Sequence, residues 1–220
     1  MAPADYPEAP DYGEVDGLPW DDRPVFIVGG GPSLIGFDFE RLRGKGHIVG
    51  VNESMFRAPC DAGVSTDVNF IRNNTSRFDI ITDLGIRLYL VLGPHWPELV
   101  PSVPGAVYLR DDRNEGLSLY TDTVRSGGTS GYSALNVAVL KRARRIVLLG
   151  FDYGCIGGKH HFHNAYTWFR DGEQYWPAWA KRFDAAAPVC RALDVEVINA
   201  SPQSAITAFP KVSIDEALGA

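Results

Sequence analysis

Short runs of apolar residues recur along the chain, and polar or glycine-rich segments separate them. Wholly apolar runs of four to six residues are typical of strands in a parallel sheet that is covered on both faces. We expect strands at 25–29, 47–52, within 61–71, 87–93, 106–109, 145–152 and 195–201.

The segments between these runs have helical patterns. We expect helices over 37–44, 76–85, 130–144 and 173–193. The helix over 130–144 is apolar on nearly all sides, and the basic residues at its end, Lys141, Arg142, Arg144 and Arg145, suit the negative pole of the helix dipole. The alternation of strands and helices predicts one α/β domain over 21–220, Rossmann-like, with a mostly parallel sheet and helices on both faces.

Two segments differ from this pattern. Residues 1–20 are rich in Pro, Asp, Glu and Gly, which predicts a flexible N-terminal tail with Trp20 as its docking point. Residues 153–172 form a long His- and aromatic-rich loop that contains the pair Gly157 and Gly158. Because glycine-flanked loops are mobile, we expect a lid over a site, and we call residues 153–172 the lid segment.

Composition narrows the class of protein. The net charge of −6 disfavours direct binding to duplex nucleic acid. The three cysteines are few, odd in number and widely spaced, which fits a reducing cytoplasm, that of the host if the chain is encoded by a phage. No apolar run reaches the roughly 18 residues of a membrane span, and no signal-peptide pattern is present.

A glycine-rich turn follows the first predicted strand, in VFIVGGGPSL. Turns without Cβ atoms let backbone N–H groups approach a phosphate, so Gly29, Gly30, Gly31 and Ser33 are candidates for a nucleotide-phosphate site. A tight turn without a ligand is the alternative. The turn has Leu34 in place of the third glycine of the dinucleotide fingerprint and lacks the lysine of a P-loop.

Other polar residues also follow predicted strands. Asn52 offers an amide to a base or ribose, or simply forms a turn. Thr129, Ser130 and Gly131 precede the apolar helix, where Ser130 would cap the helix and the following N–H groups would hold an anion. Asp152 ends a strand and could bind a hydroxyl, a ribose or a metal.

Three histidines, His160, His161 and His163, lie close together in the lid segment. They could supply a general base near neutral pH. Zinc binding and a purely structural role remain alternatives, although the spacing is not that of a standard zinc site. The nearby aromatic residues are expected mainly in packing, with one or two lining an acceptor pocket: Trp168, Phe169, Tyr175, Trp176 and Trp179.

Four blocks together resemble a known superfamily over residues 24–216: GGGPSL, GVN, TSGYSALNVAVLKRARRIVLLGFDY and VINASPQSAITAFP. The long third block is the most specific. One branch of this superfamily is the bacterial sialyltransferases of glycosyltransferase family 42. The other contains proteins of bacteria and phages grouped with 6-hydroxymethylpterin diphosphokinase.

The sialyltransferase resemblance implies a CMP- or NDP-linked sugar donor, a small-molecule or glycan acceptor, and a homo-oligomer. It carries nucleotide binding onto Asn52 and Ser130, and the catalytic base onto His161 or His163. This chain departs from the family pattern in two places: Gly30 replaces an asparagine, and Tyr153 stands one position before the family's tyrosine.

The diphosphokinase resemblance implies ATP and Mg²⁺, with Asp67 and Asp152 as metal ligands. A third hypothesis is a non-catalytic phage or prophage protein with a binding or assembly role on the same scaffold. The hypothesis that best fits the sequence is a nucleotide-dependent transferase, with a glycosyltransferase ahead of a diphosphokinase.

Overall fold

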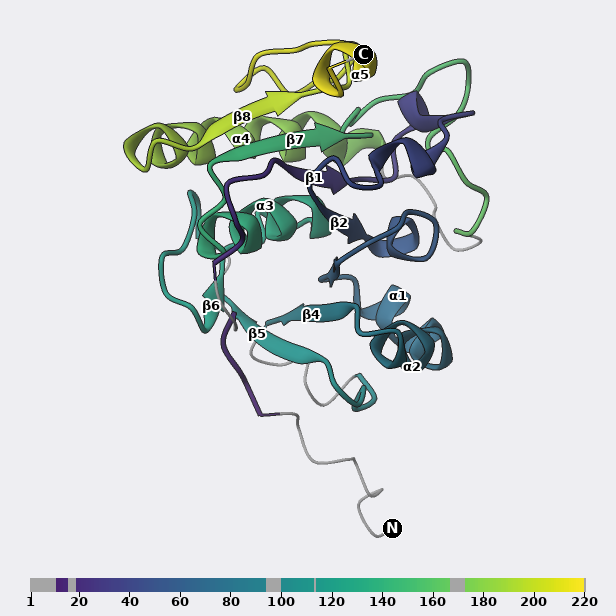
Figure 1. Ribbon diagram of the computed structural model, residues 1–220, viewed down its shortest axis with the longest axis vertical. Coiled ribbons are helices and arrows are strands. Elements are labelled where there is room, and N and C mark those ends of the chain that lie inside the picture. Colours follow the sequence, from purple (N-terminus) through teal and green to yellow (C-terminus); the bar gives the residue numbers. More distant parts are fainter. Residues whose placement is uncertain (1–10, 16–18, 94–99, 113, 167–172, 220) are drawn as a thin grey trace, which may run out of the picture.

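A computed structural model describes residues 11–15, 19–93, 100–112, 114–166 and 173–219. Its eight strands form one sheet in the order β6-β5-β4-β3-β2-β1-β7-β8, and all neighbours are parallel (Figure 1). The strands are β1 Val25–Val28, β2 His47–Val51, β3 Ala62–Ser65, β4 Arg87–Leu92, β5 Val107–Asp111, β6 Thr123–Val124, β7 Arg145–Leu149 and β8 Glu196–Asn199. The predicted α/β fold with a parallel sheet is confirmed.

The order of the strands reverses at β1. The chain builds β1 to β6 in one direction across the sheet and then returns to place β7 on the other side of β1. Ile27 therefore has Val49 of β2 as one neighbour and Leu148 of β7 as the other. In open parallel sheets, ligands bind outside the carboxyl ends of the strands at such a switch point.

Helices cover both faces of the sheet. One face packs against α3 Ser130–Leu140 and α4 Trp176–Ala192. The other packs against α1 Val68–Asn73, α2 Thr75–Asp83 and the C-terminal α5 Ile214–Ala217. Within the described residues, no helix is both long and apolar enough to cross a membrane.

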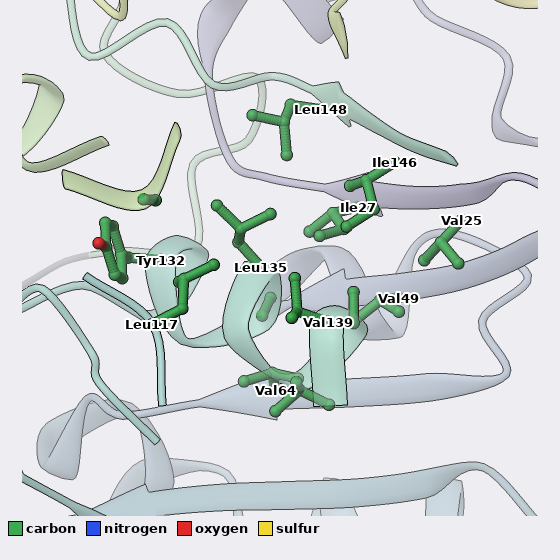
Figure 2. Packing of buried hydrophobic residues seen from close by; sticks show 14 of the residues in the cluster. Val25, Ile27, Val49, Val64, Leu117, Tyr132, Leu135, Val139, Ile146 and Leu148 are labelled. Atoms are coloured by element: carbon green, nitrogen blue, oxygen red, sulfur yellow. The ribbon is translucent and has the colours of Figure 1, made fainter. Parts of the chain in front are cut away.

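Alternate residues of β1 enter different hydrophobic clusters. Val25 and Ile27 face α3, and Figure 2 shows them in one cluster with Leu135 of that helix. Phe26 and its neighbours on that side belong to the cluster of the opposite face. Because both faces are buried, the strand has no polar position, which is the pattern seen in the sequence.

Two predicted helices are shorter than expected. The helix predicted over 130–144 ends at Leu140, because Arg142 takes a left-handed conformation (φ 59°) and the N–H of Ala143 bonds back to Ala138 O. Arg145 is the first residue of β7, so it does not belong to the helix end. The segment 37–44 forms only a 3₁₀ turn, Phe39–Leu42.

Part of the segment expected to be a tail makes specific contacts. The N–H of Gly13 donates to Tyr108 O, and that of Val15 donates to Thr121 O. Trp20 stacks on His47 at 5.3 Å between ring centroids. Residues 1–10 and 16–18 lie outside the described residues.

Candidate functional site at the β1–β7 switch point

A cavity of about 510 Å³ opens at the carboxyl ends of the central strands. This volume lies within the usual range for small-molecule sites. The lining comes from the ends of β1, β2, β3 and β7, from the start of α3, from the lid segment and from α4. The residues singled out from the sequence that line it are Gly29, Gly30, Gly31, Asn52, Asp67, Thr129, Ser130, Gly131, Asp152, Tyr153, His160, His161, Trp176 and Trp179.

The glycine turn lets two loops approach closely. The N–H of Gly29 donates to Leu149 O at 2.7 Å, and the N–H of Gly31 donates to Gly150 O at 2.8 Å. A Cβ on either glycine would lie 2.6 Å from Gly150 O, so a larger residue would separate the loops. The N–H groups of Gly29 and Gly31 are therefore used within the protein, and these two glycines shape the cavity wall rather than supply its donors.

Asp152 lies at the centre of the switch point and is 1% exposed. Its Oδ2 accepts hydrogen bonds from the hydroxyl (2.8 Å) and the N–H (3.0 Å) of Ser33. Its buried Oδ1 has no hydrogen-bond partner among the described residues. Burial raises the pKa of the carboxyl, and the hydrogen bonds from Ser33 oppose this. Because buried oxygens are normally hydrogen-bonded, Oδ1 suits a donor supplied by a ligand.

The start of α3 forms another wall of the cavity. Thr129 caps this helix, since its side chain accepts the N–H of Tyr132, and the prediction that Ser130 is the cap was wrong. Ser130 instead accepts the N–H of Thr66, at the end of β3, at 2.9 Å. The N–H groups of Ser130 and Gly131 lie in the first turn, where no helical acceptor exists. With the helix dipole they favour an anion at this end of the cavity.

Tyr153 closes the cavity beside this turn in a left-handed conformation (φ 46°). Its hydroxyl lies 3.1 Å from Thr129 Oγ1. Burial raises the pKa of Tyr153 to about 12, so the phenol is neutral at physiological pH. The hydroxyl therefore takes part in the cap of α3 as a neutral hydrogen-bonding group.

His161 is held by the glycine turn. Its Nδ1 lies 3.3 Å from Gly30 O, and a carbonyl can only accept, so Nδ1 carries the proton. The lone pair of the neutral ring is then on Nε2. Burial lowers the pKa of His161, and the hydrogen bond to Gly30 opposes this shift. The neutral ring, which is the form that can accept a proton, is thus favoured.

His163 has the other tautomer. Its Nδ1 accepts the N–H of Ala165 at 3.2 Å, so the proton lies on Nε2. Burial lowers the pKa of His163 to about 4. The ring stacks on His161, with centroids 5.3 Å apart, and is not among the described residues that line the cavity.

Tyr166 joins the two histidines to Asn52. Its ring meets the rings of His161 and His163 edge-on, at 4.9 and 4.7 Å. Its hydroxyl is hydrogen-bonded by the side chain of Asn52 and the backbone of Glu53, and burial raises its pKa. Asn52 is itself in a left-handed conformation (φ 51°), and its buried Oδ1 has no partner among the described residues.

Ion pairs to one buried carboxylate support this turn. Glu53 is 1% exposed and bonds Arg57 at 2.9 Å and Arg77 at 2.8 Å. Burial raises the pKa of Glu53, but the hydrogen bonds from Arg77 and Arg57 more than offset this, so the pKa lies below its usual value. The turn that carries Asn52 is therefore anchored by a fully paired carboxylate.

The residues expected to bind a metal or an acceptor have mixed outcomes. Asp67 lines the cavity, but its side chain also accepts the N–H of Phe70 as the cap of α1. In the described part of the chain, no group of three or more His, Cys, Asp or Glu side chains is arranged to hold a metal. Trp168 and Phe169 lie outside the described residues.

The sequence did not single out several lining residues. Thr66 and Asn69 follow β3 and line the cavity beside Asp67. Asn52 was identified because it is a polar residue that follows a buried strand, and the same pattern would have identified Thr66 and Asn69. Tyr166 belonged to the histidine-rich segment, but its contact with Asn52 depends on how the lid segment folds back.

The fold resembles that of a known enzyme. It matches the sialyltransferase CstII from Campylobacter jejuni, in complex with the substrate analogue cytidine-5'-monophosphate, with a TM-score of 0.53 and 14% identity over 87% of this chain and 85% of that chain. It also matches the sialyltransferase CST-II, in complex with trisaccharide acceptor and CMP, with a TM-score of 0.52 and 15% identity over 87% and 86% of the chains. No family model and no curated protein matches the chain. The likeness establishes a shared glycosyltransferase-like fold.

Proposed function

We propose that this protein is a glycosyltransferase that uses a nucleotide-activated sugar and a histidine base. The observation that carries the proposal is the position of His161. Its neutral ring lines the same cavity as the start of α3 and the buried carboxylate of Asp152. The proteins that share the fold are sialyltransferases solved with CMP, which supports a nucleotide-linked donor.

The cavity offers a separate partner for each part of such a donor. The N–H groups of Ser130 and Gly131 would bind the phosphate, because the first turn of α3 combines unpaired donors with the positive end of the dipole. Asn52 Oδ1 would accept a hydrogen bond from the base or ribose, and Asp152 Oδ1 one from a sugar hydroxyl. Each assignment gives a partner to a group that needs one.

The proposed reaction uses His161 as general base. Nε2 accepts the proton of the acceptor hydroxyl, and the hydroxyl oxygen forms a bond to the anomeric carbon of the donor sugar. The bond from that carbon to the phosphate oxygen breaks, and its electron pair stays on the released nucleotide. The cavity contributes by positioning the two substrates and limiting water.

The tautomers favour His161 over His163 as the base. His163 has its proton on Nε2, and its Nδ1 lone pair is occupied by the N–H of Ala165. His161 keeps its proton on Nδ1 by bonding Gly30 O, so its Nε2 can accept. The resemblance left both histidines open, and this geometry supports His161 as the base.

A thermal-shift panel tests the proposal. The purified protein is heated with CMP, CDP, UDP, GDP, ADP, ATP and sugar nucleotides, each with and without Mg²⁺. A ligand at 100 times its Kd adds about 2.7 kcal/mol to stability, which such a panel detects. A shift with CMP or a sugar nucleotide that Asn52→Gly weakens is the expected result, because this variant removes the proposed Oδ1 contact and tolerates the left-handed backbone. No shift with any nucleotide would reject the proposal and favour a non-catalytic binding or assembly role.

A diphosphokinase is the second candidate. The observation that favours it is that Asp67 and Asp152 line the same cavity and could both approach Mg²⁺. It predicts a shift with ATP only when Mg²⁺ is present, and release of AMP with a suitable acceptor. Asp67→Asn would abolish that shift but would leave a metal-independent shift with CMP intact.

A further inference from the structure

Helix α4 brings two tryptophans to the cavity. Trp176 and Trp179 are three residues apart, so they project from one side of the helix, and both line the cavity. Trp176 is buried, and its ring lies 5.2 Å from that of His160. Trp179 is half-buried and stacks on Tyr175, with centroids 5.7 Å apart. The result is an aromatic wall that no part of the proposed donor site uses.

This wall lies at one end of the cavity. Asn52 and Asp67 follow β2 and β3, whereas α4 runs alongside β7 and β8, on the other side of β1 in the sheet (Figure 1). The start of α3 lies between them. The indole Nε1 of Trp179 is 3.7 Å from the point where a Cβ on Gly128 would be, so the wall borders the α3 turn directly.

The chemistry of the wall fits a sugar ring. A pyranose has a flat face of C–H groups and a rim of hydroxyls, and an indole offers a flat polarisable face with one N–H at its edge. The hydrogen-bonding groups beside the wall, Trp179 Nε1–H and the imidazole of His160, suit the hydroxyl rim. A nucleobase would also stack, but the polar amide of Asn52 that would recognise it is at the other end.

We propose that Trp176 and Trp179 form a subsite that binds a pyranose ring of the acceptor by stacking. This inference rests on the proposed glycosyl transfer, since it places the acceptor next to the phosphate end of the donor. His161 lies at the glycine turn of β1 and directly follows His160, whose ring contacts Trp176, so a base for the acceptor hydroxyl is close to the wall in the chain.

Trp179 is the residue to test, because it is half-buried, whereas Trp176 is buried and its loss would disturb packing. Trp179→Ala removes the stacking face, and Trp179→Phe keeps a smaller ring without the N–H. Trp20→Phe is the matched control, since Trp20 is also half-buried and lies at the far end of α3, where its backbone N–H donates to Lys141 O. Circular dichroism and thermal melting check that each variant folds.

The probes are lactose and methyl β-galactoside. Their binding is measured by saturation-transfer NMR, with and without CMP. We expect saturation transfer to the C–H protons of one ring face, and a Kd about fivefold weaker in Trp179→Ala, which corresponds to an aromatic contact of about 1 kcal/mol. The Kd of Trp179→Phe for the sugars should lie between those of the unaltered protein and Trp179→Ala. The Kd of Trp20→Phe should equal that of the unaltered protein. The affinity for CMP should not change in any of these variants.

The results separate the two proposals. If CMP binds but neither sugar does, or if Trp179→Ala binds the sugars as well as the unaltered protein, the acceptor subsite is wrong and the transferase proposal survives. If the sugars bind through Trp179 but no nucleotide binds, the wall is a pyranose-binding site, but glycosyl transfer and the role of the wall as an acceptor subsite are rejected. If neither class of ligand binds, both proposals fall.

Discussion

Ser33 and Asp152 are 119 residues apart, and both the hydroxyl and the backbone N–H of Ser33 donate to one oxygen of the Asp152 carboxylate. This pair joins the loop after β1 to the loop after β7, the two strands between which the sheet order reverses. It also fixes the direction of the other carboxylate oxygen. The geometry of the cavity therefore depends on a contact between two loops that lie far apart in the sequence.

Ser33→Ala should weaken this connection. It removes one of the two hydrogen bonds to a carboxylate that is 1% exposed, so we expect a loss of about 1 kcal/mol in the free energy of unfolding. Urea denaturation measures this loss. Ser76→Ala, on the exposed side of α2, is the control and should change little. Equal midpoints for the two variants would show that the hydroxyl bond contributes nothing to stability.

Gly31→Ala should be far more harmful than Gly30→Ala. A Cβ on Gly31 would lie 2.6 Å from Gly150 O and would also overlap Asp152, whereas the nearest atom to a Cβ on Gly30 is His161 Nδ1 at 3.4 Å. We expect Gly31→Ala to lose about 1–3 kcal/mol by overpacking. Thermal melting of both variants tests this. If Gly30→Ala proved the less stable of the two, the close approach of the loops would be refuted.

His161→Ala should lower kcat about 10²-fold or more while leaving nucleotide affinity unchanged, because it removes the base and no donor contact. His163→Ala should have a smaller effect on kcat, since that ring stacks on His161 without lining the cavity. Steady-state kinetics and calorimetric titration with CMP measure the two quantities. An unchanged kcat in His161→Ala would remove the base from the proposed mechanism.

The pH profile should reflect the burial of His161. Burial lowers its pKa from 6.5, so the neutral base persists to lower pH than for an exposed histidine. We expect kcat/KM to be level through neutral pH and to fall only once the pH drops below 6.5, as the ring gains its second proton. Rates measured across this range test the prediction, and an acid limb that begins above 6.5 would contradict it.

Most strands were predictable because burial on both faces leaves no polar position, as in Val25–Val28. The two-residue strand β6, Thr123–Val124, was not predicted. The helix ends were harder to predict. Helix α3 ends where Arg142 takes a left-handed conformation, and no glycine stands at that position to indicate it in the sequence. In the site, Asp152 was found from its place at the end of a strand, and His161 from the cluster of histidines in the lid segment. The sequence did not predict that the N–H groups of Gly29 and Gly31 bond the end of β7, or that Tyr166 contacts Asn52. Both contacts depend on packing between distant segments.

The position of β1 has a consequence for synthesis of the chain. Until Arg145–Leu149 leaves the ribosome, β1 has a neighbour on one side only, and its other edge exposes backbone groups that can pair with another chain. The glycine turn and Asn52 are made early, but Asp152, His161 and Trp179 are made after β7. A product truncated before Arg145 would therefore have most of the sheet, an open central edge and no complete cavity, and we expect it to aggregate.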